Sequence, residues 1–336
     1  MQKQLLLQER PNGFPDSNTF SIKETEIDTP NDQELLVKTL YLSVDPYMRG
    51  RMSDAKSYIA PFELNEPISG GGIAQVIESK DSSIKKGTII TGMLPFQEYA
   101  VVKANQVRVL DMHGAPISAA LGALGMPGLT AYFGLSDIGK PKEGETVVIS
   151  GAAGAVGSIA GQLARLKGAR VVGIVGSKEK ADLLINELGF SAAINYKEDH
   201  LEDALKQACP DGIDVYFENV GGEVSDHIWP LLNPLARIPV CGAISSYNLK
   251  KGEEDIGPRI QSYLVKTRAR MQGFLYGDYA DQYETAYREL SEYVKNNDIV
   301  FKETIIEGFD RIPEAFNGLF SGQNIGKQLI KIADPT

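Results

Sequence analysis

The stretch TVVISGAAGAVG, residues 146–157, decides the fold of this 336-residue chain. Residues 146–150 are mostly β-branched and apolar, so they predict a short buried strand. A glycine-rich turn follows at once, and apolar residues then recur at helical spacing from Val156 to Leu166. This succession is typical of a dinucleotide-binding βαβ unit, in which the glycines let a pyrophosphate approach the N-terminus of the helix. The alternative is a turn that only brings the helix close to the sheet.

The same rhythm of short apolar runs and helical patterns continues through the middle of the chain. Ser177 is placed to cap the second helix, and residues 224–232 predict a later one. Pro239 removes a hydrogen-bond donor from the fifth run, so we expect an irregularity there. The six expected strands cover residues 146–150, 171–175, 192–194, 213–217, 237–241 and 271–275. The pattern predicts an α/β fold with a doubly wound parallel (Rossmann) sheet over residues 126–300.

The first 125 residues have a different character. Short β-rich runs such as 34–40 and 72–77 are separated by proline and glycine turns, and long helical patterns are absent. This predicts a compact β-rich domain over residues 1–125. The tail, residues 301–336, returns to short mixed elements and is expected to pack on that domain.

Composition excludes several classes of protein. The formal net charge of −10 argues against nucleic acid or an anionic membrane surface as the main partner. No apolar run is long enough to span a membrane, and the start MQKQLLLQER does not fit a signal peptide, so we expect a cytoplasmic protein.

The inventory of metal ligands is thin. Two cysteines, Cys209 and Cys241, and three histidines, His113, His200 and His227, are scattered singly. None of them has the paired spacing of a zinc site, so we expect no metal. Cys241 has no histidine nearby in sequence, and we interpret it as a small packed residue rather than a nucleophile.

The residues after the second expected strand bear on the choice of cofactor. NAD-binding sites usually place an acidic residue there, but this chain has Gly176 and Ser177. A hydroxyl and an ammonium group would bind a 2′-phosphate, which a carboxylate would repel. Ser177 and Lys180 therefore favour NADPH over NADH, while Lys178 remains open between a phosphate contact and a solvated surface side chain.

Six segments resemble one known family. They are VDPYMRGRM (44–52), GMPGLTAYFGL (125–135), GAAGAVGS (151–158), FENVGG (217–222), CGAISSYN (241–248) and NIGKQLI (324–330). The chain resembles the zinc-independent prostaglandin reductase, or leukotriene 12-hydroxydehydrogenase, branch of the medium-chain dehydrogenase/reductase superfamily. Bacterial curcumin reductases and plant double-bond reductases belong to this branch. The resemblance implies reduction of the C=C bond of α,β-unsaturated ketones and aldehydes by NADPH, and a homodimer.

The resemblance also implies a domain plan and a cofactor site. Residues 1–125, completed by 301–336, would form a GroES-like catalytic domain, and Met126 would lie near the nicotinamide. Gly154 to Gly157 would contact the pyrophosphate, and Lys180 and Tyr196 the 2′-phosphate. The further implied cofactor contacts are Asn219, Cys241, Gly242, Ala243, Ile244, Ser245, Tyr247, Phe274, Leu275 and Asn324, with Ala155 and Val156 inside the glycine turn.

One segment departs from the animal members of the branch. Where they carry a proline-rich loop beside the substrate, this chain has the charged stretch 248–255. A prostaglandin or another fatty-acid substrate is therefore not implied.

Two tyrosines are candidates for the chemistry. Hydride addition to the β-carbon leaves negative charge on the carbonyl oxygen, and without a metal that charge needs hydrogen-bond donors. Tyr247 is the first candidate donor, because a tyrosine hydroxyl stays protonated at pH 7. Tyr47 either supplies the α-carbon proton or forms a wall of the pocket. Arg49 and Arg51 are expected to form structural ion pairs.

Two other functions compete with this interpretation. One is an NADPH quinone reductase of the same superfamily, which also lacks zinc. The other is a non-catalytic NADPH-binding protein.

Overall fold

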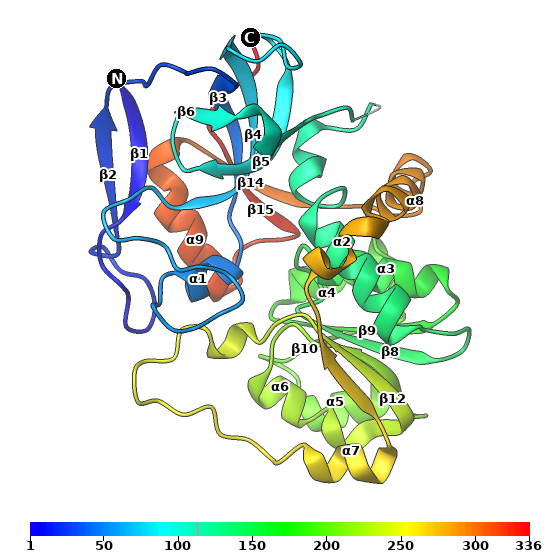
Figure 1. Cartoon of the computed structure of the whole chain (residues 1–336). Helices are drawn as coiled ribbons and strands as arrows, with labels where there is room; N and C mark the ends of the chain where they lie inside the picture. The colour runs from blue at the N-terminus through cyan, green and yellow to red at the C-terminus, as the bar shows by residue number, and fades with distance from the viewer. Residues whose placement is uncertain (113) are drawn as a thin grey trace.

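The computed structural model describes residues 1–112 and 114–336, so His113 lies outside the described residues. Two sheets of different character organise the chain (Figure 1). Blue and cyan strands gather with the red-orange and red elements at the end of the chain. The green-to-yellow sheet makes up the rest with its helices, which include the orange helix α8 (Tyr283–Lys295). No described helix is both long and apolar enough to cross a membrane.

The six-stranded sheet has the order β10-β9-β8-β11-β12-β13, and every neighbouring pair is parallel. This order, which reverses between β8 and β11, is that of the doubly wound dinucleotide fold. The predicted fold class is therefore confirmed. The strands are β8 (Thr146–Ser150), β9 (Arg170–Val175), β10 (Ala192–Asn195), β11 (Ile213–Phe217), β12 (Leu232–Val240) and β13 (Arg270–Gly273).

Helices cover both faces of this sheet because its strands are apolar on both sides. Along β8, Val147 and Ile149 belong to one core cluster and Val148 to the opposite one, as the alternation of side chains in a strand requires. The first face packs against α2 (Met126–Phe133), α3 (Gly157–Leu166), α4 (Lys178–Asn186) and α8 (Tyr283–Lys295). The second packs against α5 (Leu201–Ala208), α6 (Gly222–Asp226) and α7 (Gln261–Thr267).

Two details of this sheet differ from expectation. The irregularity predicted at Pro239 lies earlier, because Ile213 pairs with Leu232 whereas Val215 pairs with Arg237. Pro239 itself keeps register with β13, and its carbonyl oxygen accepts a bond of 3.0 Å from the Glu218 amide. Proline lacks only the donor, so its acceptor still serves the ladder.

The single helix predicted for residues 224–232 is also wrong. α6 ends at Asp226, and a separate 3₁₀ turn covers Trp229–Leu231. Pro230 cannot donate the backbone bond that a continuous helix would need there.

The second sheet joins the two ends of the chain. Its order is β14-β15-β3-β4-β5-β7, with β6 paired to β3, and β15 runs antiparallel to β3 with Ile330 opposite Leu42. Its strands are β3 (Glu34–Ser43), β4 (Ser69–Ser79), β5 (Ile89–Pro95), β6 (Tyr99–Lys103), β7 (Val107–Val109), β14 (Glu303–Glu307) and β15 (Lys327–Lys331). A hairpin of β1 (Gln2–Leu7) and β2 (Phe20–Thr25) and the helices α1 (Tyr47–Arg51) and α9 (Ile312–Ser321) complete this part.

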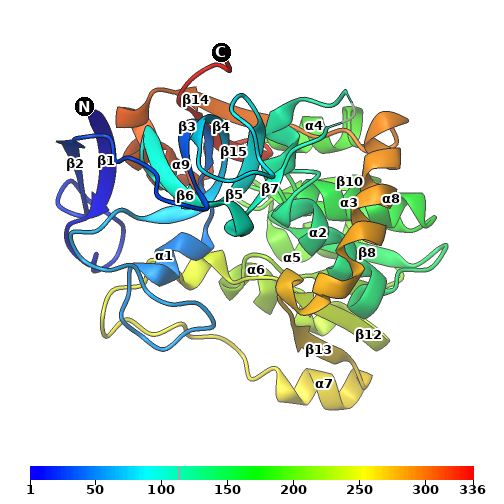
Figure 2. The same ribbon diagram turned by 45° about the horizontal axis from the view of Figure 1, so that its top comes forward.

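A long segment after residue 247 runs beside α1 before α7 begins (Figure 2). Arg49 Nε donates to Asn248 Oδ1 at 2.9 Å, and the Lys251 amide donates to Asn12 Oδ1 at 2.7 Å. These bonds tie the start of the segment to α1 and to the loop before β2.

Candidate active site

The predicted cofactor residues gather at the carboxyl edge of the six-stranded sheet. The glycine turn follows β8, Ser177 and Lys180 follow β9, Tyr196 follows β10, and Asn219 follows β11. The segment from Cys241 to Tyr247 follows β12, and Phe274 and Leu275 follow β13. Carboxyl ends of parallel strands share one edge, and ligands of open α/β sheets bind there. The fold therefore brings together residues spread over more than 100 positions.

The glycine turn is shaped for close approach to its backbone. Gly151 has φ +60°, a conformation that favours glycine, and a Cβ on Gly157 would lie 2.4 Å from the Gly151 carbonyl oxygen. α3 begins at Gly157, so the positive end of its helix dipole lies at this loop, where the Ser158 amide donates to the Gly154 carbonyl at 3.1 Å. An anionic diphosphate fits such a cradle.

The C-terminal segment closes one side of this turn. Gly326 forms a bridge with Gly154, and its amide donates to the Ala153 carbonyl at 2.7 Å. Asn324 lies two residues away and donates from Nδ2 to the Gly326 carbonyl at 2.8 Å. The C-terminal segment therefore places Asn324 near the glycine turn.

The two residues directly after β9, Gly176 and Ser177, carry no carboxylate, and two lysines follow them with Glu179 between. Ser177 caps α4, because its hydroxyl accepts a bond of 3.3 Å from the Lys180 amide. Lys180 is half-buried, and its Nζ donates to the Gly322 carbonyl at 2.7 Å. Lys178 is exposed and paired with Asp182 at 2.6 Å, which favours the surface interpretation for Lys178. A 2′-phosphate fits beside Ser177 and Lys180.

The segment after β12 is fixed to the end of β11. The Ile244 amide donates to the Asn219 carbonyl at 3.2 Å, and the Ser245 amide donates to the Val220 carbonyl at 2.9 Å. Asn219 in turn donates from Nδ2 to the Ser150 carbonyl at 2.7 Å. The ends of three central strands are therefore held as one unit at the position where the sheet order reverses.

Tyr247 stands at the end of this segment with its hydroxyl turned back over it. The hydroxyl oxygen accepts from the Ala243 amide at 3.4 Å, and a Cβ on Gly242 would lie 2.9 Å from that oxygen. Because the oxygen acts as acceptor, its proton is free to be donated elsewhere. Burial raises the pKa of the Tyr247 hydroxyl, so the donor form persists at neutral pH.

Tyr47 and Tyr247 belong to a cluster with two tyrosines that the sequence did not single out. The pKa of Tyr58 is raised by partial burial, and the charges of Tyr247, Cys241 and Tyr276 also act on it. The pKa of Tyr47 is raised by burial first and then by Asp45, and it also responds to Tyr58 and Tyr276. These mutual effects indicate that four phenol groups from α1, the loop after it, the segment after β12 and the segment after β13 lie near one another, although Tyr58 itself is 64% exposed.

A buried ion pair lies under Tyr47. Lys327 Nζ is 3.0 Å from Asp45 Oδ1 and donates also to the carbonyl oxygens of Val44 and Gln328. The Ser43 hydroxyl donates to the other carboxylate oxygen of Asp45. β15 thereby fixes the turn that begins α1 and presents Tyr47.

The two predicted ion pairs of the α1 arginines are wrong. Arg49 donates to the carbonyls of Pro11 and Gly13 and to the Asn248 side chain. Arg51 donates to the Ala60 and Ser69 carbonyls and lies 4.0 Å from the Phe62 ring centre. Loop carbonyls rather than carboxylates surround this turn, so the guanidinium groups satisfy backbone acceptors.

Profiles of two protein families match the chain. The profile described as the N-terminal domain of oxidoreductase matches residues 3–110, and that described as zinc-binding dehydrogenase matches residues 155–292. The chain is 42% identical to the NADPH-dependent curcumin reductase of Escherichia coli, covering 98% of this chain and 96% of that one. It is 42% identical to the NADP(+)-dependent 2-alkenal reductase of Nicotiana tabacum, covering 98% and 97%.

A solved structure agrees with these relatives. CurA of Vibrio vulnificus in complex with NADPH superposes with a TM-score of 0.94 at 41% identity, covering 99% of this chain and all of that chain. The chain belongs to the curcumin and prostaglandin reductase branch of the medium-chain dehydrogenase/reductase superfamily. It is an NADPH-dependent oxidoreductase, which confirms the family and cofactor predicted from its motifs.

Three further residues predicted to contact the cofactor begin α2 or follow β13. Met126 is half-buried at the start of α2. Phe274 packs edge-on against Phe217 at 6.4 Å, and a Cβ on Gly134 would lie 2.7 Å from its ring. Leu275 is 39% exposed. Phe274 therefore has a packing role of its own in addition to any contact with the cofactor.

Sequence reasoning also missed a buried carboxylate. Glu218 is 3% exposed and accepts from the Ser150 and Tyr216 hydroxyls at 3.1 and 2.9 Å. It accepts further from the amides of Val220 and Gly221 at 2.8 and 2.9 Å. In the sequence, the one sign that Glu218 is a buried acceptor is its position in FENVGG, between a buried strand and a pair of glycines.

The inventory of nucleophiles and metal ligands in this reductase is short. Burial raises the pKa of the Cys241 thiol to about 12, and the nearby Glu218 charge adds to this, so the thiolate is scarce at neutral pH. Although one matched profile is described as zinc-binding, residues 1–112 and 114–336 contain no group of three or more His, Cys, Asp or Glu that could hold a metal.

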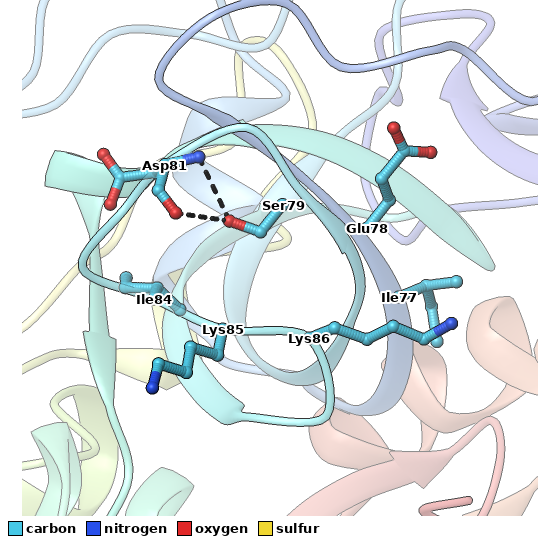
Figure 3. A pocket seen from close by; sticks show the side chains of 7 residues that line it. All are labelled: Ile77, Glu78, Ser79, Asp81, Ile84, Lys85 and Lys86. Carbon is cyan, nitrogen blue, oxygen red and sulfur yellow. Dashed lines mark hydrogen bonds between the residues drawn. The ribbon is translucent and has the colours of Figure 1, made fainter.

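A hollow elsewhere on the surface is lined by no cysteine, histidine or tyrosine. It lies between the end of β4 and the turn before β5, where Ser79 Oγ donates to the Asp81 carbonyl at 2.8 Å (Figure 3). Its lining residues are Ile77, Glu78, Ser79, Asp81, Ile84, Lys85 and Lys86. None of them belongs to the predicted site.

Proposed function

We propose that this enzyme reduces the C=C bond of α,β-unsaturated ketones and aldehydes. The observation that carries the proposal is the Tyr247 hydroxyl, which accepts a backbone N–H and keeps its proton free at the reversal point of the sheet. The names of two relatives, a curcumin reductase and a 2-alkenal reductase, support this substrate class.

The chain has residues suited to each part of the cofactor. The glycine turn 154–157 would hold the diphosphate, with Asn324 beside it. Ser177, Lys180 and Tyr196 would hold the 2′-phosphate. Met126, Asn219, Phe274, Leu275 and residues 241–247 would border the remainder.

Tyr247 would stabilise the charge that forms during the reaction. Bound NADPH supplies a hydride, and its addition at the β-carbon turns the carbonyl oxygen into an enolate oxygen. A preformed donor aimed at that oxygen lowers the barrier, because it requires no reorganisation as charge develops. The raised pKa of Tyr247 keeps this donor protonated.

Tyr47 is the second group proposed for the chemistry. Burial raises the pKa of its hydroxyl, which therefore stays protonated at neutral pH. It would either deliver the proton to the α-carbon, with Arg51 and Tyr58 close by, or form a wall of the pocket. No metal takes part in either version.

The domain plan is part of the proposal. We infer that residues 1–125 with 301–336 form the catalytic domain and residues 126–300 the NADPH-binding domain. The sheet that joins β14 and β15 to β3 supports this division, as does the position of Tyr47 on α1.

We further infer a homodimer formed at the β13 edge. β13 ends the six-stranded sheet, and all four of its residues are exposed. Val265 of the neighbouring α7 is 78% exposed and Met271 of β13 38%. An edge strand with free backbone groups and exposed apolar residues can pair with the same strand of a second copy of the chain. Light scattering should give twice the mass of the chain.

We place the enzyme in the cytoplasm. The two cysteines form no disulfide, which suits a reducing compartment, and the dependence on NADPH suits it as well.

One assay tests the proposed reaction against its rivals. NADPH oxidation is followed with an enone, an enal, a quinone and a simple ketone at equal concentrations. We expect turnover with the enone and the enal and little with the simple ketone. Turnover confined to the quinone would favour a quinone reductase, and no turnover with any of the four would favour a non-catalytic protein.

A further inference from the structure

A second lysine stands beside the proposed 2′-phosphate site and plays no part in the family motifs. Lys197 follows β10, directly after Tyr196. A Cβ placed on Gly176, at the end of β9, would lie 3.3 Å from Lys197 Cε and 3.3 Å from the Tyr196 hydroxyl. Tyr196 and Lys197 therefore pack so closely against Gly176 that even a methyl group there would be tight.

The backbone around Lys197 is fixed by side-chain bonds. Asn195 Oδ1 accepts from the Lys197 amide at 3.3 Å, and Asp199 Oδ2 accepts from the Asn195 amide at 2.8 Å. Lys197 Nζ lies 6.0 Å from the centre of the Tyr196 ring. The turn after β10 thus directs the lysine stem toward Gly176.

Lys197 and Lys180 form a pair of cations with little compensation. The charge of Lys197 acts on Lys180 and, after burial, lowers the pKa of the Lys180 ammonium, while Glu179 acts in the opposite sense. Across the described residues, neither lysine has a carboxylate oxygen within 4.0 Å. By contrast, Lys178 is neutralised by Asp182 at 2.6 Å. Two like charges held near each other favour an anion between them.

The donors of the two lysines are also available. Lys180 Nζ uses one of its three donors on the Gly322 carbonyl. Lys197 Nζ donates no hydrogen bond in the part of the chain that is described. A phosphate dianion bound by both ammonium groups would satisfy these remaining donors.

We propose that Lys197 is a second cation for the 2′-phosphate of NADPH and, together with Lys180, determines the preference for NADPH over NADH. The inference rests on the proposed placement of the cofactor at this edge. It adds a specificity-determining residue that touches the phosphate and not the reacting atoms.

The test is direct binding to the full-length enzyme. Isothermal titration measures the Kd of NADP⁺, NAD⁺ and 2′,5′-ADP for wild type, Lys197→Met and Lys197→Arg. Methionine keeps the stem against Tyr196 but removes the charge. Lys178→Met is the matched control, because Lys178 lies on the same edge but is paired with Asp182.

We expect Lys197→Met to weaken NADP⁺ and 2′,5′-ADP by about 5- to 20-fold, with NAD⁺ unchanged, and the difference from wild type to shrink at high salt. Lys197→Arg should recover most of the loss, and Lys178→Met should bind as wild type does. Unchanged NADP⁺ affinity in Lys197→Met, or an equal loss for NAD⁺, would overturn the inference. If wild type itself did not prefer NADP⁺ over NAD⁺, the placement of the cofactor would fail, and the inference with it.

Discussion

Replacing Tyr247 with phenylalanine separates the hydroxyl from the ring. The bond lost in the resting enzyme is the 3.4 Å contact from the Ala243 amide, which is long for an N–H···O bond. We therefore expect the free energy of unfolding to change by less than about 1 kcal/mol. The Kd of NADPH should also change little.

The effect on the rate should be larger than the effect on stability. Loss of one donor from an oxyanion site costs about 100- to 1,000-fold in kcat in other enzymes. A ribose hydroxyl of the cofactor is expected to share the charge here, so we expect a loss of about 10- to 100-fold, or roughly 1.4 to 2.7 kcal/mol. Tyr47→Phe should lower the rate less, unless Tyr47 donates the α-carbon proton, in which case the solvent isotope effect should change.

The pH dependence gives an independent readout. The donor is the protonated hydroxyl, and its pKa lies above the usual value of about 10, so rising pH removes the donor only in strongly alkaline solution. The wild-type kcat should stay flat from about pH 7 to 9, and the alkaline decline due to Tyr247 should be missing in Tyr247→Phe.

The assay is NADPH oxidation with a simple enone under conditions where chemistry limits the rate. Tyr41→Phe is a matched control, because Tyr41 is half-buried in β3 and also has a pKa raised by burial. A Tyr247→Phe enzyme with wild-type turnover would remove this hydroxyl from the mechanism.

Three further predictions concern the cofactor, the fold and the metal. Wild type should bind NADPH at least about tenfold more tightly than NADH, and Lys180→Ala should weaken NADPH with NADH almost unchanged; equal losses would show that Lys180 does not bind the 2′-phosphate. Asp45→Asn leaves the Lys327 charge buried without its partner and should lower the free energy of unfolding by about 3 to 5 kcal/mol in urea titrations, whereas a loss below about 1 kcal/mol would contradict the buried pair. Prolonged chelation should leave activity intact, whereas loss of activity that zinc restores would refute the metal-free mechanism.

The doubly wound sheet could be predicted because its signals are local. Each strand, turn and helix of that sheet is indicated by a pattern of consecutive residues. Examples are the apolar run 146–150, the glycine turn that follows it and the helix cap at Ser177. The break at Pro230 also has a local cause, because proline cannot donate the backbone bond of a continuous helix. The register change before Arg237 depends on pairing with β11, which no local pattern reveals.

The missed site residues share one physical reason. Tyr58 and Tyr276 come from separate loops and approach Tyr47 only in the folded chain. Lys197 likewise approaches Lys180 only when β9 and β10 pair. Glu218 accepts from its sequence neighbours Tyr216 and Val220, but its bond with the Ser150 hydroxyl joins positions 68 apart and forms only when β8 and β11 pair. The α1 arginines were assigned carboxylate partners from charge alone, whereas the folded loops offered carbonyl oxygens.

The most direct test of the reaction follows the hydride itself. The enzyme is given an enone and NADPH deuterated at the transferred C4 position, and the product is analysed by NMR. We expect the saturated ketone with deuterium at the β-carbon and a solvent-derived proton at the α-carbon. An allylic alcohol with deuterium at the carbonyl carbon, or a saturated ketone without deuterium at the β-carbon, would contradict the proposed reaction.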